Sequence, residues 1–163
     1  QTCALPISLG ANDLARAVST MTRLNRGAAR AAVAAGLHAA TDVTGFGLAG
    51  HAHEMAEGSG VRITLRLADV PLLGPARALA AAGTVPGGTG RNREHFLAEG
   101  RVSGEGLDGV SLDLFFDPQT SGGLLVAVPA GHAGEWERAR NEHGVQAWRV
   151  GEASAGRGVA LLP

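Results

Sequence analysis

The chain has 163 residues, of which 45% are hydrophobic and 18% are charged, and its formal net charge is -1. This composition is typical of a globular protein with one hydrophobic core, and the net charge gives no electrostatic sign of a protein that binds nucleic acid or an anionic membrane. All 14 basic residues are arginine, which excludes a Walker-type phosphate loop and Schiff-base chemistry because both need lysine. The single cysteine, Cys3, excludes an internal disulfide and a multi-cysteine metal site.

No apolar run approaches the roughly 20 residues that a membrane-spanning helix needs, and the chain does not open on a secretory signal pattern. We therefore expect a cytoplasmic protein without nucleic-acid or membrane partners. Residues 1–8 lack the periodicity of the segments that follow, and we expect them to be a non-native extension. Cys3 lies in that extension and is expected to have no catalytic role. Residues 9–163 are expected to form one domain.

In the first half of the chain, apolar residues at intervals of three and four predict a helix over 12–35, bent or broken near Gly27. The apolar segment 37–43 predicts a strand that runs into a turn. A helix is expected over 46–57, and the alternation of apolar and polar residues over 61–67 predicts a strand with one buried face.

The second half of the chain is punctuated by proline and glycine. A short helix is predicted over 75–82, a loop over 86–88 and a helix over 91–99. Residues 100–110 contain four glycines and predict an exposed loop, whereas the apolar run 124–128 is the clearest buried strand. The remaining expectations are a helix over 130–143 and strands over 146–150 and 158–162.

Strands that alternate with helices indicate an α/β (α+β) fold class. We expect a single layered domain in which a mixed β-sheet is packed with helices. No internal repeat, linker or block of like charges divides the chain.

The strongest local pattern is residues 41–51, Thr-Asp-Val-Thr-Gly-Phe-Gly-Leu-Ala-Gly-His. A strand ending at Asp42 would turn through two glycines into a helix whose first N–H groups favour anions. Thr44 is expected to cap that helix, and Asp42 could hold a magnesium ion that bridges phosphates. The alternative is that Asp42 and Thr44 only cap a helix while the glycines serve packing, and the local pattern fits both interpretations.

Residues 116–125, Phe-Asp-Pro-Gln-Thr-Ser-Gly-Gly-Leu-Leu, form a polar turn that opens into an apolar run. Such a turn can present a nest of backbone N–H groups to an anion. It can equally be a tight connection whose geometry Pro118 and the glycines set. Both interpretations stay open from the local pattern.

Residues 86–92, Pro-Gly-Gly-Thr-Gly-Arg-Asn, are a third candidate, because the guanidinium group of Arg91 suits bidentate contact with phosphate. His51 and His53 do not predict a metal site, since residues two apart on a helix do not share a face. We expect His53 and Glu54 to be surface groups.

Taken in this order, these segments resemble the C-terminal domain of selenophosphate synthetase (selenide, water dikinase), a family of the AIR synthetase-related superfamily. The resemblance covers about residues 9–163. The matching strings are Leu24-Asn25-Arg26, residues 40–48, Gly50-His51, Pro86-Gly87-Gly88-Thr89 with Asn92, residues 116–125, and residues 147–152.

The resemblance implies an ATP-dependent phosphotransferase that makes selenophosphate from selenide, ATP and water, with release of AMP and phosphate. It implies a cytoplasmic homodimer that uses magnesium. It implies Asp42 as a metal ligand. It also implies residues near the phosphate or selenide, namely Thr44, Gly45, Gly47, His51, Gly87, Gly88, Thr89, Thr120, Ser121, Gly122 and Gly123. No catalytic residue is implied within this chain.

The family's catalytic cysteine or selenocysteine, its catalytic lysine and its other metal-binding aspartates belong to an N-terminal domain that has no counterpart in this sequence. We therefore expect a C-terminal fragment that is inactive without that domain, because one carboxylate is too few to gather magnesium and ATP.

Two alternatives remain. The parent could be a sister enzyme, namely AIR synthetase, thiamine monophosphate kinase or the hydrogenase maturation protein. The chain could also be a non-catalytic, dimer-supporting module.

Overall fold

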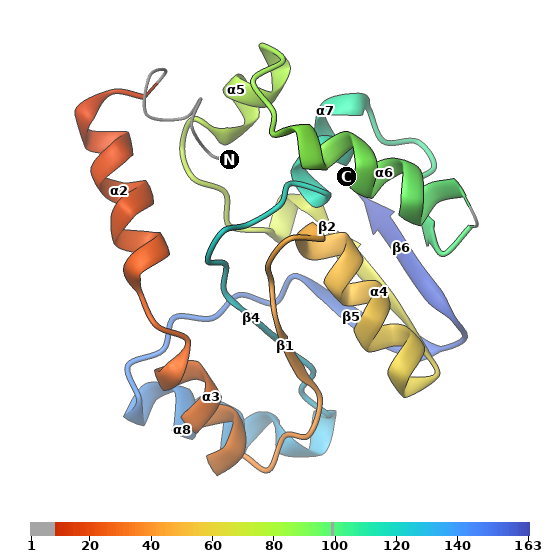
Figure 1. The fold of residues 1–163 in the computed structure, drawn as a ribbon. Coiled ribbons are helices and arrows are strands. Elements are labelled where there is room, and N and C mark those ends of the chain that lie inside the picture. The colour runs from red at the N-terminus through yellow and green to blue at the C-terminus, as the bar shows by residue number, and fades with distance from the viewer. Residues whose placement is uncertain (1–8, 99) are drawn as a thin grey trace.

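The computed structural model describes residues 9–98 and 100–163. The predicted extension 1–8, with Cys3, and the last residue of the predicted helix 91–99 lie outside the described residues. Helices and two β-sheets make up the fold, which confirms the predicted α/β class (Figure 1).

The helices are α2 (Ala11–Thr22), α3 (Arg26–Ala34), α4 (Gly47–Ser59), α5 (Ala76–Ala81), α6 (Gly87–Ala98), α7 (Gly109–Phe115) and α8 (Ala133–Glu142). Short 3-10 turns lie at Leu67–Asp69 and Ala130–His132. The strands are β1 (Ala40–Asp42), β2 (Val61–Arg66), β3 (Val102–Ser103), β4 (Leu124–Val126), β5 (Gly151–Ala155) and β6 (Gly158–Leu162).

The larger sheet has the strand order β3-β6-β2-β5. β6 pairs in parallel with β2 and β3, whereas β5 pairs antiparallel with β2, so the sheet is mixed as predicted. Ile63 and Leu65 on β2 are buried while Arg62 is exposed, which confirms the predicted alternation. α4 covers one face of this sheet (Figure 1).

The main core lies between α4 and the larger sheet. Ala49, Ala52 and Ala56 face it at helical spacing, and their small side chains let the α4 backbone approach the strands closely. Phe115 and Phe116, at the end of α7, are both fully buried in the same cluster. The chain therefore enters the loop after Phe116 directly from the core.

A second cluster joins α3 to α8, which pack side by side (Figure 1). Its buried residues are mostly alanines, together with Leu37. The antiparallel pair β1–β4 connects the two clusters, because Leu125 packs against the main core and Val126 against the second cluster. Successive side chains of one strand point to opposite faces, so this ladder has a core on each side.

Two predictions differ from the structure in detail. The predicted break in the helix 12–35 is present, but the backbone leaves the helical region at Arg23, where ψ is 122°, and not near Gly27. The predicted loop 86–88 instead contains the start of α6, which begins at Gly87. Thr89 N donates to Pro86 O at 3.0 Å, so the proline stands at the entry of the helix.

One loop prediction and two strand predictions are also wrong. The expected loop 100–110 contains β3, whose Val102 is 1% exposed. Residues 146–150 form no strand, and β5 begins only at Gly151. The segment 124–128 is a strand only over β4, and it is half-buried, not buried. β3 forms because it pairs with β6, a partner strand far away in the sequence.

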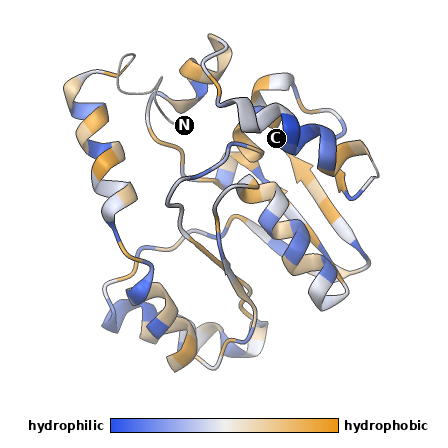
Figure 2. Cartoon of the chain, in the orientation of Figure 1, coloured by the Kyte–Doolittle hydropathy of each residue, from blue (hydrophilic) through white to orange (hydrophobic). Residues whose placement is uncertain are grey.

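α2 stands apart from the larger sheet, and only Ala17 of this helix is buried (Figure 1). Its apolar residues Val18 and Met21 are exposed, and hydrophobic colour alternates with polar colour along the helix (Figure 2). Leu24, just after the helix, is 69% exposed. An amphipathic helix with an uncovered apolar side is typical of a surface that meets another protein segment.

Gly47 joins the start of α4 to the end of α7. Its φ is +72°, and a Cβ there would lie 2.7 Å from the carbonyl carbon of Phe116. We predict that Gly47→Ala lowers the free energy of unfolding by about 2 kcal/mol or more, because the left-handed backbone and the close contact both oppose a side chain. Urea denaturation measures this loss.

The control is Gly58→Ala on the same helix, where no atom lies within 4 Å of the added Cβ. Its stability should stay within about 1 kcal/mol of the wild type or exceed it, since alanine favours the helix. Equal stability of the Gly47 variant and the wild type would contradict the prediction.

Candidate functional site

The first two sequence motifs, residues 41–51 and 116–125, contact each other through their backbones. Val43 N donates to Gly123 O at 2.9 Å, and Gln119 N donates to Thr44 O at 2.9 Å. A Cβ at Gly122 would overlap the carbonyl oxygen of Val43. Glycine is therefore required at 122 by close approach, and the β1–α4 turn is held against the loop 117–123.

The buried side-chain amide of Asn92 connects the third motif, residues 86–92, to the other two through hydrogen bonds. Its Nδ2 donates to Gly45 O at 2.8 Å and to Phe116 O at 3.0 Å. In the first turn of α6, a Cβ at Gly88 would lie 3.2 Å from Cγ of Pro118. Thus the structure brings all three segments to one place. Asn25 joins them from the α2–α3 connection, where its Nδ2 donates to Gly122 O at 3.0 Å.

Asp42 is the last residue of β1 and is exposed. Within residues 9–98 and 100–163, its side chain forms no hydrogen bond or ion pair. A free carboxylate at the mouth of the turn is available to a hard cation, which prefers oxygen ligands.

Thr44 does not cap α4, so that prediction is wrong. The helix begins at Gly47, with Phe46 at the N-cap position and no side-chain cap. The hydroxyl of Thr44 lies instead 3.1 Å from Nε2 of His51, and Nδ1 of His51 lies 2.9 Å from a carboxylate oxygen of Glu54. These three side chains form a continuous hydrogen-bonded chain from the turn to the surface of α4.

The surface prediction for His53 is wrong, whereas Glu54 is exposed as expected. His53 is 8% exposed, and its ring centroid lies 5.6 Å from that of Phe96. It follows Ala49 by four residues and Ala52 by one, so it shares the buried side of α4. Its Nε2 reaches the carboxylate of Glu57 at 3.5 Å.

The other predicted site residues differ in exposure. Thr89 is 1% exposed and faces the interior, and its hydroxyl has no partner among the residues that the structure describes. Gly47 is buried against Phe116, while Gly88 and Gly122 are half-buried. The exposed members are Gly45, Gly87, Thr120, Ser121 and Gly123.

Asp117 is a titratable group of this site to which the sequence assigned no role. Its Oδ2 accepts a hydrogen bond of 2.6 Å from Nε2 of Gln119. Burial raises the pKa of Asp117 above its ordinary value of 3.8, the Gln119 hydrogen bond opposes this rise, and the charge of Asp113 adds to it. The sequence signal was its place directly after a buried apolar run and before Pro118.

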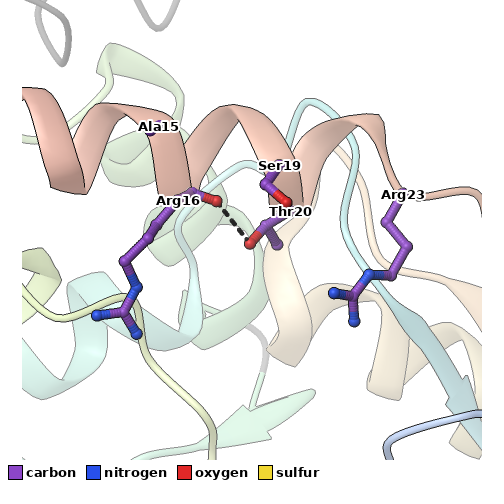
Figure 3. Close-up of a pocket in the computed structure, with 5 residues that line it drawn as sticks. All are labelled: Ala15, Arg16, Ser19, Thr20 and Arg23. Atoms are coloured by element: carbon purple, nitrogen blue, oxygen red, sulfur yellow. Dashed lines mark hydrogen bonds between the residues drawn. The ribbon is translucent and has the colours of Figure 1, made fainter.

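A separate surface recess runs along α2 and is lined by Ala15, Arg16, Ser19, Thr20 and Arg23. The Arg16 and Arg23 side chains extend from one side of this helix (Figure 3). Thr20 Oγ1 donates to Arg16 O at 2.9 Å. None of the predicted site residues lines this recess.

In the described part of the chain, no three His, Cys, Asp or Glu side chains gather as a metal site would require. Nor does any described helix combine the length and apolar character needed to cross a membrane.

Comparison with known proteins agrees with the geometry. The family described as "AIR synthase related protein, C-terminal domain" matches residues 8–162. The chain belongs to this family. A selenide, water dikinase of Photorhabdus laumondii is 46% identical over 138 residues, which cover 85% of this chain and 39% of that protein.

Two further relatives carry the same description. A selenide, water dikinase of Bordetella bronchiseptica is 47% identical over 150 residues, covering 91% of this chain and 42% of the relative. A selenide, water dikinase 2 of Peptoclostridium acidaminophilum is 44% identical over 116 residues, covering 71% of this chain and 33% of the relative. The predicted family is confirmed, and the chain spans 33% to 42% of the length of these relatives.

The raised pKa of Asp117 predicts how stability depends on pH. The native state binds this proton more tightly than the unfolded chain, so the contribution of Asp117 falls as pH rises from 3.8 through the raised pKa. Asp117→Asn keeps an acceptor for Gln119 and removes the charge. The free energy of unfolding of this variant, relative to the wild type, should therefore increase across that window in urea denaturation.

Asp108 provides a control of opposite sign, because a hydrogen bond from Ser111 N lowers the pKa of its carboxyl group. Its contribution is present above 3.8 and is lost as pH falls below that value. The relative stability of Asp108→Asn should therefore increase as pH falls. A flat profile for Asp117→Asn, or the same sign for both variants, would contradict the assignment.

Proposed function

We propose that this chain is the C-terminal part of a selenide, water dikinase, an enzyme that makes selenophosphate from selenide, ATP and water and releases AMP and phosphate. The identities of 46% and 47% to proteins of that description support this activity over those of the sister families. The observation that carries the proposal is the free, exposed carboxylate of Asp42 at the point where the three motif segments meet.

Asp42 would supply one oxygen ligand to a magnesium ion. These residues fit a metal site that is shared with another domain. The carboxylate has no partner in the described residues, and no cluster of three ligating side chains accompanies it there. The ATP phosphates and an N-terminal domain would provide the other ligands. A magnesium ion held there would neutralise the negative charge of the phosphates.

The neighbouring loops would bind phosphate or selenide. Gly45, Gly87, Thr120, Ser121 and Gly123 are exposed beside the same turn, and glycines allow an anion to approach backbone N–H groups. Gly47, Gly88, Thr89 and Gly122 would support these loops from beneath, since they are buried or half-buried.

The partners of this part would be an N-terminal domain and, in a cytoplasmic homodimer, a second subunit. Exposed apolar side chains on and after α2, namely Val18, Met21 and Leu24, support such contacts. The net charge of -1 supports the absence of nucleic-acid and anionic-membrane partners.

A chimera tests the activity. Residues 9–163 would replace the matching part of the Bordetella bronchiseptica relative, and selenide-dependent release of AMP from ATP would be measured. We expect an active chimera, in which Asp42→Asn lowers kcat/KM by about 100-fold or more because a metal ligand is lost. Thermal stability should not change, since Asp42 is exposed.

The matched control is Asp69→Asn, which removes another exposed carboxylate and should leave turnover unchanged. Near-normal turnover of the Asp42 variant would exclude the metal role and favour a non-catalytic, dimer-supporting module. An inactive wild-type chimera, beside an active parent enzyme, would contradict the proposed activity.

The isolated 163-residue chain should not bind magnesium and ATP at micromolar concentration, because it offers a single carboxylate to the metal. Isothermal titration calorimetry measures this directly. Micromolar binding by the chain would show that it holds a complete nucleotide site.

A further inference from the structure

Both ring nitrogens of His51 have polar partners. Nε2 lies 3.1 Å from Thr44 Oγ1, and Nδ1 lies 2.9 Å from Glu54 Oε2. A ring flipped by 180° would place carbon atoms at both contacts, so the hydrogen bonds define the ring orientation. The imidazole is 90% buried, with 10% of the side chain exposed, and Phe46 stands 5.5 Å from it between ring centroids.

The direction of each hydrogen bond follows from the chemistry of the three groups. An ionised carboxylate can only accept, so Nδ1 of His51 must carry the proton and donate to Glu54. In the neutral ring, Nε2 is then a lone pair that can only accept. The hydroxyl of Thr44 must therefore donate to Nε2, and its single proton is committed to that bond.

We propose that Glu54 and His51 are positioning residues that fix the hydrogen-bonding polarity of Thr44, so that its oxygen offers only lone pairs to the site beside Asp42. This oxygen can then coordinate a divalent cation or accept a hydrogen bond from a water molecule bound to the cation. A phosphate oxygen, which has no proton to donate, does not fit. This inference rests on the proposed function and reverses the phosphate-binding roles that the sequence predicted for Thr44 and His51.

The placement of the neighbouring residues supports this assignment. Val43 is 8% exposed and is held by its bond to Gly123, whereas Asp42 is exposed and Thr44 is half-buried. Thr44 follows Asp42 by only two residues, in the turn that leads from β1 to α4. Two oxygen acceptors so close along the chain suit a hard cation and its water ligands.

The hydrogen bonds also assign the roles of His51 and Glu54. The His51 ring is buried and both of its nitrogens are engaged, so it has no nitrogen left for a ligand that binds at Asp42, and Glu54 contacts the ring of His51 on the side away from Thr44. Their effect passes through Thr44. Such outer partners fix the orientation of ligating groups, and their loss typically weakens metal binding by about 10- to 100-fold.

NMR of the full 163-residue chain tests the polarity without any ligand. With histidine labelled by nitrogen-15, long-range correlation spectra at about pH 8, where an ordinary imidazole is neutral, report which ring nitrogen carries the proton. The expected result is that His51 is protonated on Nδ1 and bare on Nε2. A ring protonated on Nε2, or an equal mixture of the two forms, would overturn the proposal.

Glu54→Gln should abolish this preference, because the glutamine amide can donate to Nδ1 as well as accept from it. The matched control is Glu57→Gln, one turn later on α4, where the carboxylate faces His53. It should leave the His51 tautomer unchanged. An unchanged tautomer in Glu54→Gln would show that Glu54 does not set it.

The chimera then tests whether the Thr44 oxygen meets the magnesium ion and its water ligands or a phosphate group. Thr44→Val keeps the shape and should raise the magnesium concentration for half-maximal activity about tenfold, with the KM for ATP at saturating magnesium unchanged. Thr44→Ser, which keeps the hydroxyl, should restore the wild-type value. A rise in the KM for ATP at saturating magnesium would instead indicate a phosphate contact and overturn the proposal. If the wild-type chimera is inactive, the proposed function fails, while the NMR result still decides the polarity of Thr44.

Discussion

The close contact between two backbone segments, the β1–α4 turn and the loop after α7, organises the rest of the site. Hydrogen bonds link Val43 to Gly123 and Thr44 to Gln119, and the space that a side chain at 122 would need is filled by a carbonyl group. Backbone atoms cannot retreat as a flexible side chain can, so the two segments have little freedom to slide. Asp42 therefore emerges at a fixed point beside the loop 117–123.

This contact creates polar groups that must be satisfied inside the protein. The buried amide of Asn92 donates to the carbonyl groups of both Gly45 and Phe116. An unsatisfied buried carbonyl would cost about 1–3 kcal/mol, so one side chain on α6 stabilises both turns. Phe96 lies one turn further along the helix and packs on the ring of Phe116 at 6.2 Å between centroids. The site is thus continuous with the hydrophobic core.

The side chains that this part of the protein offers at the turn are oxygen acceptors. Asp42 presents a free carboxylate, and Thr44 is linked through His51 to Glu54. The loops on either side expose glycines, where the proposed function has an anion approach the backbone. In that proposal, a cation near Asp42 and phosphate near the loops would place opposite charges side by side, as phosphoryl transfer needs. The proposed function depends on the three segments together and not on one residue alone.

Much of the site was readable from local patterns. The alternation over β2, the helix that became α4 and the exposed carboxylate at residue 42 depend on neighbours within a few residues, whose spacing the sequence shows directly. The motifs at 41–51, 86–92 and 116–125 also identified the family without coordinates. Their order along the chain, however, did not show that they touch.

By itself, the sequence determined the family, the α/β class and the carboxylate at residue 42, because each depends on short strings of residues. Only the tertiary structure decided that His53 is buried, that Val102 pairs with β6 and that Thr44 reaches His51 instead of capping its helix. These outcomes depend on which side of α4 meets the sheet and which distant strand lies alongside. Such long-range packing competes with local preference and overrides it, so no pattern of neighbouring residues could reveal them.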